Sequence, residues 1–227
     1  MTERIISIGD IHGCATALAT LIDAIQPTEL DTIVFLGDYI DRGPDSKGVL
    51  DQIIALGQRC SVVPLMGNHE EMLLAVLAGG QSEIKFWLTF GGAAALASYG
   101  WKGRPDLRTA DVRSLIPREH ISFVKRCRNY FETAHHIFVH AYYDPDRPLN
   151  EQYWQGLRWM SLPSVPVPHC SGKVAIVGHT PQRSGDILDL GCLKVIDTLA
   201  HGGGWLTALE VETGRRVWQS NEAGELK

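Results

Sequence analysis

Residues 4–13 read RIISIGDIHG, a short apolar run that leads into a glycine-rich turn holding an aspartate and a histidine. The same order recurs twice in the first seventy residues, as TIVFLGDYIDRG at residues 32–43 and SVVPLMGNHE at residues 61–70. After each turn, apolar residues return at helical spacing. Strands that alternate with helices in this way predict an α/β fold, with a parallel sheet and right-handed crossover connections.

Side chains of the kinds that bind metal ions follow five of the apolar runs. They are Asp10 and His12, Asp38 and Asp41, Asn68 and His69, His140, and His179. In an open parallel sheet, ligands bind beyond the carboxyl ends of the strands. We therefore expect these residues, although far apart in sequence, to converge at one edge of the sheet. Their mixture of carboxylate, imidazole and amide groups suits manganese, iron or zinc rather than thiolate-bound zinc.

Two local features support a metal site. In Asp10-Ile11-His12, residues i and i+2 of an extended segment point to the same side, so both polar side chains can reach one cation. The flanking glycines let the backbone turn sharply at that point. Asp38 is expected to bridge two cations, because a carboxylate offers two oxygens.

Residues from about 80 to 130 have a different character from the rest of the chain. Helical stretches at residues 83–90 and 120–130 are separated by glycine- and proline-rich breaks at residues 91–106. We expect this segment to be a helical cap inserted into a single domain that spans residues 1–227.

The second half of the chain adds further strands and one long connection. Strand character returns at residues 137–140, 174–177, 187–190, 193–196 and 206–211. The proline-rich stretch 144–171 is expected to be a long loop that is either functional or partly mobile. In the first half, Pro64 lies inside the third apolar run, which predicts an edge strand or an early strand end there.

The composition restricts the partners and the compartment. The net charge of −5, with no basic run, argues against nucleic acid as the main partner. The N-terminus has no signal-peptide pattern, and no segment approaches the roughly 18 apolar residues of a membrane helix, so no membrane partner is expected. The five cysteines are scattered and form no CxxC pair, which disfavours disulfides and structural zinc. A cytoplasmic location is the expectation.

Five motifs occur in order and together resemble one family. They are GDIHG (9–13), GDYIDRG (37–43), GNHE (67–70), a strand ending in His140-Ala141, and GHT (178–180). The set is similar to the signature of the phosphoprotein phosphatases, a family of the calcineurin-like metallophosphoesterases. Over residues 4–200 the chain most resembles the compact bacterial serine/threonine phosphatases. The resemblance implies a sandwich of two mixed β-sheets flanked by helices, with a helical cap insertion.

The resemblance implies that two divalent metal ions are the cofactors. The ligands of the first ion would be Asp10, His12 and Asp38. The ligands of the second ion would be Asp38, Asn68, His140 and His179. Manganese is the expected metal, with iron, zinc or cobalt as alternatives. Two cations about 3.5–4 Å apart would lower the pKa of a bridging water from about 15.7 toward neutrality.

Other residues match the catalytic and phosphate-binding positions of the family. His69 resembles the catalytic acid, oriented by Asp41, and Arg42 and Asn68 resemble phosphate-binding groups. A second phosphate-binding arginine is expected before GHT. Arg158 is the best candidate, although the sequence around it, GLRWM, differs from the usual motif of the family.

The sequence departs from the family pattern in places that would shape the pocket. Tyr142-Tyr143 stand where a glycine is common, which would change the pocket floor. His201 follows a strand that resembles the family's IDT strand, and we weigh a structural role for it against a role lining the site. Trp154 and Trp159 are expected to pack in the core or cap, with a substrate wall as the alternative.

The implied activity is hydrolysis of phosphate monoesters, in particular phosphoserine and phosphothreonine in proteins, by direct attack of a hydroxide held between the metal ions. A small-molecule hydrolase of the same family, acting on dinucleoside polyphosphates or phosphodiesters, is the main alternative. A non-catalytic scaffold is the second, but it predicts gaps among the ligands or the His69–Asp41 pair, and the sequence has none. A purely structural metal site would not need a paired acid and phosphate-binding arginines.

Overall fold

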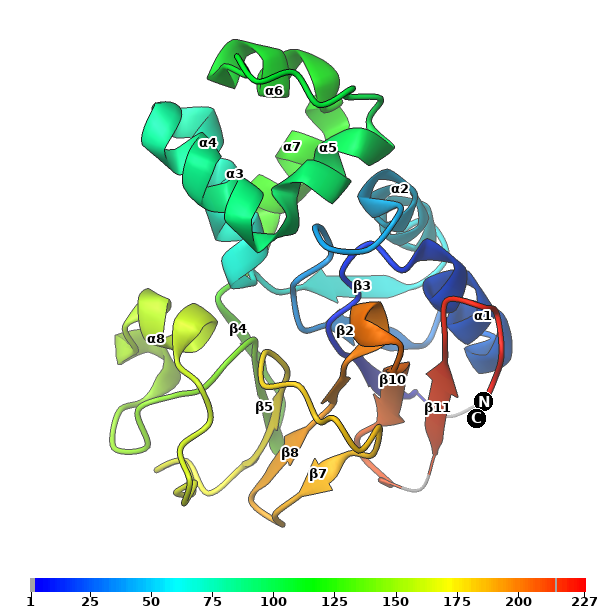
Figure 1. Ribbon diagram of the computed structural model, residues 1–227. Coiled ribbons are helices and arrows are strands. Elements are labelled where there is room, and N and C mark those ends of the chain that lie inside the picture. Colours follow the sequence, from blue (N-terminus) through cyan, green and yellow to red (C-terminus); the bar gives the residue numbers. More distant parts are fainter. Residues whose placement is uncertain (1–2, 215) are drawn as a thin grey trace.

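The computed structural model describes residues 3–214 and 216–227, which form two β-sheets with helices around them (Figure 1). The strands of the first sheet are β1 (Ile5–Ile8), β2 (Thr32–Phe35), β3 (Ser61–Pro64), β9 (Asp197–Thr198), β10 (Trp205–Glu210) and β11 (Val217–Ser220). The strands of the second sheet are β4 (Tyr130–Glu132), β5 (His136–Val139), β6 (Val174–Val177), β7 (Leu188–Asp189) and β8 (Leu193–Val195).

Both sheets are mixed, as the family resemblance implies. The first has the order β11-β10-β1-β2-β3, with β9 paired to β10, and the second has the order β4-β5-β6-β8-β7. The predicted parallel pairing of β1, β2 and β3 is confirmed, while β10 joins β1 antiparallel. Strand β3 ends at Pro64 on the sheet edge, a position where the missing N–H of proline is tolerated.

Helices follow the first three strands and then form a group of their own. The helices after β1, β2 and β3 are α1 (Ala15–Ile25), α2 (Ser46–Leu56) and α3 (Asn68–Ala78). Residues 81–126, here called the cap, contain α4 (Gln81–Trp87), the kinked segment η1 (Leu88–Gly92), α5 (Ala93–Ser98), α6 (Thr109–Leu115) and α7 (Arg118–Arg126). Figure 1 shows the cap helices grouped together above the sheets. Within the described residues, no helix is both long enough and apolar enough to cross a lipid bilayer.

Three local predictions for the loops and helices are wrong. The expected break at residues 91–106 contains α5, because the alanine-rich sequence Ala93–Ser98 has a high helix propensity that outweighs the preceding glycines. The expected loop 144–171 contains the 3₁₀-helix η2 (Leu149–Glu151) and the helix α8 (Trp154–Trp159). The helix expected over residues 120–130 ends earlier, at Arg126, and Tyr130 begins strand β4.

Alternate residues of each central strand pack into different apolar layers, as a period of two requires. In β2, Ile33 and Phe35 pack with the helices, whereas Val34 packs between the two sheets. In β5, Phe138 also lies between the sheets, while its neighbour Val139 packs on the outer face of the second sheet. The sandwich is therefore closed by a shared inner layer and covered on both outer faces.

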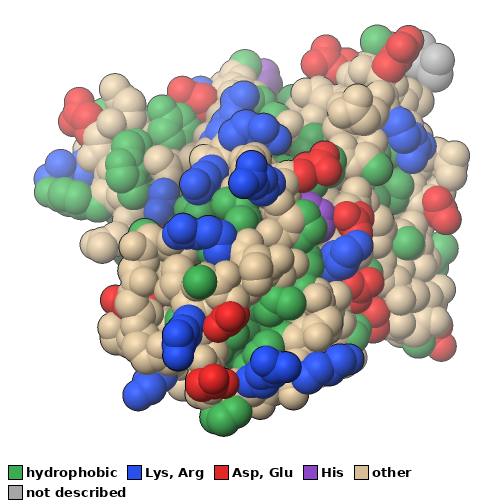
Figure 2. All heavy atoms as spheres, turned by 90° about the horizontal axis from the view of Figure 1, so that it is seen from above, with side chains coloured by type: hydrophobic (Ala, Val, Ile, Leu, Met, Phe, Trp, Pro, Cys, Tyr) green, Lys and Arg blue, Asp and Glu red, His purple; other side chains and the backbone are tan. Residues whose placement is uncertain are grey.

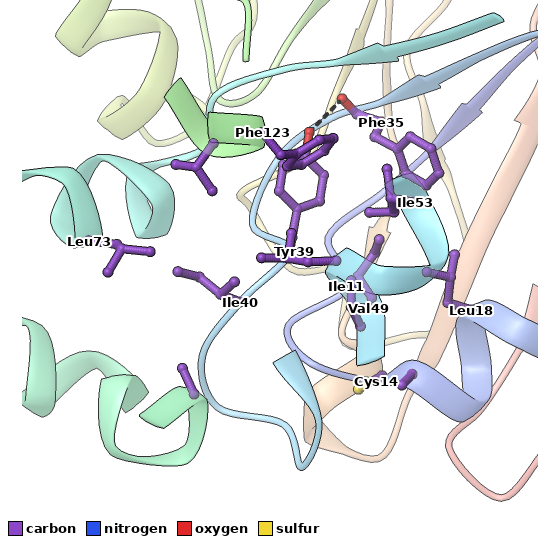
Figure 3. Close-up of a cluster of buried hydrophobic side chains, with 14 of the residues drawn as sticks. Ile11, Cys14, Leu18, Phe35, Tyr39, Ile40, Val49, Ile53, Leu73 and Phe123 are labelled. Carbon is purple, nitrogen blue, oxygen red and sulfur yellow. Dashed lines mark hydrogen bonds between the residues drawn. The ribbon is translucent and has the colours of Figure 1, made fainter. Parts of the chain in front are cut away.

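Tyr39 anchors the turn after β2 in this core (Figure 3). Its ring is fully buried and meets the ring of Phe123 from α7 edge-on, with centroids 5.6 Å apart. Its hydroxyl donates to the carbonyl of Leu65 at 2.6 Å, at the end of β3. The turn that carries Asp38 and Asp41 is thus fixed to both the neighbouring strand and the cap.

Asp31, which directly precedes β2, accepts four side-chain and backbone hydrogen bonds that fix the start of this strand. Its carboxylate accepts from Arg4 Nε and Nη2 at 2.9 and 2.6 Å, and from the amide and hydroxyl of Thr28 at 2.6 and 3.0 Å. The hydrogen bond from Arg4 is the largest cause that lowers the pKa of Asp31 from 3.8 to about 2. A carboxyl group with a lowered folded-state pKa stabilises the fold above its unfolded pKa, and this contribution is lost as the pH falls through the folded value.

The variant Asp31→Asn is expected to lower the free energy of unfolding by about 1–2 kcal/mol at pH 7. Urea denaturation from pH 7 to pH 2 measures this, and the difference from the wild type should narrow below about pH 4. Asp186→Asn is the control, since it removes an exposed ion pair to Lys227 at 2.9 Å and should cost less than about 0.5 kcal/mol. A loss in Asp31→Asn that does not change with pH would contradict the electrostatic explanation.

Candidate metal and active site

The turns that follow β1 and β2 are bonded directly to each other. The amides of Ile11 and His12 both donate to the carbonyl of Asp38, at 3.1 and 2.8 Å. The turn after β6 joins the end of β5 in the same way, because the amide of Gly178 donates to the carbonyl of His140 at 2.8 Å. The two sheets meet at this place as well, because His140 Nδ1, at the end of β5, lies 2.9 Å from the carbonyl of Leu36, which directly follows β2.

Left-handed backbone conformations are concentrated in these turns. Among the described residues other than glycine, seven have a positive φ, and five of them lie in the predicted motifs. The five are His12 (46°), Asp38 (51°), Asp41 (74°), Arg42 (67°) and His179 (61°). Such conformations persist where the surrounding structure holds them and cluster at functional sites. Their location agrees with a binding or catalytic centre.

Asp38 lies at the centre of two groups of side chains that have metal-ligand chemistry. One group is His12, Asp38 and His69, and the other is Asp38, His140 and His179; in each, one ligand atom per residue lies within 4.8 Å of the others. His140 Nε2 is 3.4 Å from Asp38 Oδ1, and His12 Nε2 is 3.4 Å from Asp38 Oδ2. The two carboxylate oxygens thus face different histidines, as a bridging ligand requires.

The hydrogen bonds of His140 test whether a cation fits this site. Its Nδ1 lies 2.9 Å from the carbonyl of Leu36 and donates to it, which leaves a lone pair on Nε2. That Nε2 lies 3.0 Å from Asn68 Oδ1, which is also an acceptor, and 3.4 Å from Asp38. His12 Nδ1 likewise lies 3.1 Å from the carbonyl of Ile40, but its Nε2 faces a donor, Arg42 Nη1, at 3.0 Å. Buried acceptors that face one another without a proton between them fit a bound metal ion.

The protonation of the histidines agrees with a ligand role. Burial lowers the pKa of His12 and of His179, and it lowers the pKa of His140 to about 4, so these rings are neutral at neutral pH. Burial opposes ionisation of Asp38, but the surrounding histidines, His140 first, keep its pKa below the usual value. An ionised carboxylate among neutral imidazoles is the state that binds a divalent cation.

Asp10, from the first turn, belongs to neither group but contacts the backbone of one of their members, His179. Its two carboxylate oxygens accept from the amide of His179 at 3.1 and 3.0 Å. Burial, followed by the charges of Asp197 and Asp38, raises its pKa well above the usual value. Gly178 must lack a side chain here, since a Cβ would lie 2.1 Å from Asp10 Oδ1. Crowded buried carboxylates of this kind are stabilised by a cation.

His69 and Asp41 form a buried pair beside the cluster. His69 Nδ1 lies 2.7 Å from Asp41 Oδ2, and in the described part of the chain its Nε2 has no hydrogen-bond partner. That nitrogen is 3.9 Å from Asp38 Oδ2. Burial alone would lower the pKa of His69, but the charge of Asp38 and the hydrogen bond to Asp41 raise it. The imidazole is therefore oriented and disposed to carry a proton at Nε2.

Arg42 and His201 both contact His12. Arg42 is exposed, and its Nη1 is 3.0 Å from His12 Nε2, so its guanidinium reaches the edge of the cluster. The ring of His201 meets the ring of His12 edge-on, with centroids 4.6 Å apart. Burial and the charge of Arg42 lower the pKa of His201 to about 4. A neutral imidazole thus borders the site at this point.

Arg158 is paired with residues to which no metal or catalytic role is assigned. Its Nη1 lies 3.0 Å from Glu71 Oε1, and its Nη2 donates to Asn129. Trp159 donates to the other oxygen of Glu71 at 2.6 Å, so α8 is tied to α3 next to the site. Trp154 instead stacks on Tyr130, with centroids 6.5 Å apart. The phosphate-binding role of Arg158 stays a prediction.

Glu70 is a residue of the site that sequence reasoning quoted but did not assign. It is fully buried at the start of α3 and accepts from the amides of Asp38, Tyr39 and Gly67 at 2.8, 2.9 and 3.1 Å. Burial is the main reason that its pKa rises to about 8. Glu70 therefore fixes the backbone of Asp38 to the N-terminus of α3. The sequence signal that could have identified Glu70 as a site residue is its position at the end of the GNHE motif.

The two-sheet fold and this buried cluster of metal-type ligands are of the kind found in metallophosphoesterases. A family model described as calcineurin-like phosphoesterase matches residues 3–185. The chain belongs to the calcineurin-like phosphoesterase family, as its motifs predict. The family uses divalent metals, which agrees with the ligand groups around Asp38.

Related proteins differ in their substrates. The chain is 30% identical to serine/threonine-protein phosphatase 1 of Salmonella typhimurium over 218 residues, covering 90% of each chain. It is 42% identical to the symmetrical bis(5′-nucleosyl)-tetraphosphatase of Burkholderia pseudomallei over 74 residues, which make up 33% of this chain and only 26% of that protein. A crystal structure provisionally assigned as a diadenosine tetraphosphatase has a TM-score of 0.70 at 22% identity, covering 97% of this chain and 95% of that one.

A further solved structure supports the fold alone. The cold-active protein-tyrosine phosphatase of a psychrophilic Shewanella species has a TM-score of 0.68 at 18% identity, covering all of this chain and 80% of that one. At such identity the likeness shows a shared fold and does not establish a shared substrate.

Proposed function

We propose that this protein is a metal-dependent phosphomonoesterase that hydrolyses phosphoserine and phosphothreonine in proteins or peptides. The observation that carries the proposal is the buried cluster of acceptors around Asp38, which lies beside the His69–Asp41 pair. A cluster that can bind cations, next to an oriented proton donor, suits the hydrolysis of a phosphate ester. In that reaction negative charge has to be stabilised on the phosphoryl oxygens and on the leaving group. The similarity to a serine/threonine phosphatase over 90% of both chains supports the substrate class.

In this proposal different residues bind the metal ions and the phosphate, except Asn68, which is a candidate for both. When bound, divalent cations supply an activated water and offset charge on the phosphoryl oxygens. We assign their binding to Asp10, His12, Asp38, Asn68, His140 and His179, with manganese as the first choice. Arg42 would bind the phosphoryl oxygens from the exposed side, because a guanidinium offers two parallel donors to an oxyanion. Arg158 and Asn68 are the further candidates for contact with the phosphate.

His69 would supply the proton that the leaving alkoxide needs. Asp41 accepts the hydrogen bond from Nδ1, so the ring presents Nε2 to the substrate and the carboxylate stabilises the imidazolium. Because an alkoxide is a poor leaving group, this proton transfer should matter most for phosphoserine and phosphothreonine. His201 borders the same space and is proposed to line it.

The cap presents a positive face that agrees with an acidic substrate. Residues 81–126 contain eight lysines and arginines against four aspartates and glutamates, although the whole chain has a net charge of −5. Figure 2 shows Lys and Arg side chains gathered on the face seen from above, where the cap lies in Figure 1. Such a field raises the encounter rate with phosphorylated, acidic ligands.

The deciding experiment compares a phosphoserine peptide with diadenosine tetraphosphate as substrates. The protein is stripped of metal, Mn²⁺ is added back, and kcat/KM is measured for both at matched concentrations. We expect turnover that depends on the metal, with the peptide the better substrate. Preference for diadenosine tetraphosphate would replace the proposed function with the dinucleoside polyphosphate alternative. A folded protein that hydrolyses neither with Mn²⁺, Fe²⁺, Co²⁺ or Zn²⁺ would instead favour a scaffold.

A further inference from the structure

A tryptophan of the cap contacts the proposed catalytic pair directly. Trp87, which is fully buried, donates from its indole Nε1 to Asp41 Oδ2 at 2.8 Å. The same oxygen lies 2.7 Å from His69 Nδ1. The other oxygen, Oδ1, has no hydrogen-bond partner among the residues that the structure describes. A carboxylate fixed by two donors on one oxygen cannot rotate without losing both, so the indole sets the direction in which Asp41 holds the imidazole.

The backbone of the same cap segment holds Arg42. The carbonyl of Gly91 accepts from the amide of Arg42 at 3.3 Å, and a Cβ at Gly91 would lie 2.7 Å from that nitrogen. Gly91 has a φ of 104°, which forms the kink of η1. Asp41 and Arg42 themselves have φ values of 74° and 67°. Because such conformations need support from their surroundings, the cap contributes to the geometry of both residues.

Phe90, which directly precedes Gly91, contacts His69, the proposed acid. The ring of Phe90 meets the ring of His69 edge-on, with centroids 6.5 Å apart and an interplanar angle of 81°. Residues 87–91, here called the junction segment, therefore contact Asp41, His69 and Arg42 in turn. All three residues belong to the proposed machinery, and we assign no metal ion to them.

We propose that Trp87 is a positioning residue for the Asp41–His69 pair, and that the junction segment makes the cap a part of the catalytic centre. The proposal rests on the phosphatase function proposed above. A purely structural tryptophan would affect stability, and its loss would slow all substrates alike. A residue that positions the proton donor acts on leaving-group protonation, so its loss should slow substrates with basic leaving groups most.

The test is Trp87→Phe, which keeps an aromatic ring in the buried position and removes the N–H donor. Trp101→Phe is the matched control, because the Nε1 of this other cap tryptophan has no hydrogen-bond partner within the described residues. With saturating Mn²⁺, Trp87→Phe should lower kcat about 10- to 50-fold for a phosphoserine peptide and less than about threefold for p-nitrophenyl phosphate. KM should change less than about twofold, and Trp101→Phe should match the wild type on both substrates.

A double-mutant cycle separates positioning from packing. In the Asp41→Asn background, Trp87→Phe should lower kcat for the peptide no further, since both changes remove the same orientation of His69. Additive losses, or equal losses on both substrates, would overturn the proposal. If Trp87→Phe does not fold, the NMR chemical shift of the Trp87 indole N–H is compared instead between the wild type and the Asp41→Asn variant. The resonance should shift in the Asp41→Asn variant, and an unshifted resonance would also overturn the proposal.

The comparison of substrates also distinguishes a failure of the proposed substrate class from a failure of the proposed role of Trp87. A wild-type protein that hydrolyses p-nitrophenyl phosphate but not the peptide would reject the proposed substrate class. The role of Trp87 would then be measured with β-glycerophosphate as the alkyl ester, with the same expected split between alkyl and aryl leaving groups.

Discussion

Asp38→Asn is expected to lower metal-dependent kcat/KM by about 10³-fold or more. Both oxygens of Asp38 are committed, since His140 Nε2 and His12 Nε2 each lie 3.4 Å from a different one. Asparagine removes the negative charge from the middle of the cluster and replaces one oxygen by a donor. It also tolerates the φ of 51° found at this position, so the turn should be kept.

The metal content distinguishes loss of binding from misfolding in this variant. Manganese bound per chain, measured by plasma mass spectrometry after dialysis, should fall below that of the wild type. The circular dichroism spectrum should remain unchanged. Asp186→Asn, an exposed carboxylate paired with Lys227, serves as the control and should retain both metal and activity. A fully active Asp38→Asn protein with normal manganese content would exclude Asp38 as the shared ligand.

His69→Asn is expected to lower kcat for a phosphoserine peptide by about 10²–10⁴-fold, the usual contribution of a general acid. The loss should be much smaller for p-nitrophenyl phosphate, because p-nitrophenolate departs without protonation. The buried contact of 2.7 Å between His69 Nδ1 and Asp41 Oδ2 is the reason to expect an acid rather than a passive side chain. Steady-state kinetics on both substrates, with His135→Asn as an exposed control, measure the difference.

Metal content again decides between two roles for His69. Its Nε2 also belongs to a group with His12 and Asp38 in which the ligand atoms lie within 4.8 Å of one another. If His69 is the acid, His69→Asn keeps its manganese and loses activity mainly on the peptide. Loss of manganese together with equal losses on both substrates would make His69 a ligand instead.

The convergence of the metal-type residues could be predicted without coordinates. Each of these residues directly follows a short apolar run, and the carboxyl ends of parallel strands meet at one edge. The structure brings Asp38, His140 and His179 together, but Asp38 follows a strand of the first sheet and the two histidines follow strands of the second, so the expected single sheet edge is in fact the meeting of two sheets. The strand pattern therefore predicted the turns within each sheet, whereas the packing of the two sheets on each other decided that the two sets of turns meet.

Predictions failed where local composition was ambiguous. Residues 91–106 contain enough glycine and proline to indicate a break, yet alanines 93–95 begin the helix α5. The proline-rich stretch 144–171 contains α8, which packs through Leu157 into the outer apolar layer of the second sheet. Tertiary packing stabilised both helices against a weak local preference.

The sequence by itself determined the class of protein, the strand–turn–helix order and the residues expected to gather at the sheet edge. Only the tertiary structure decided which partners those residues have. Trp87 and Asp41 are 46 positions apart, and Glu70 and Asp38 are 32 apart, in contacts that no periodicity connects. A turn motif depends on backbone geometry within a few residues, whereas a side-chain contact between the cap and a turn depends on how separate helices pack.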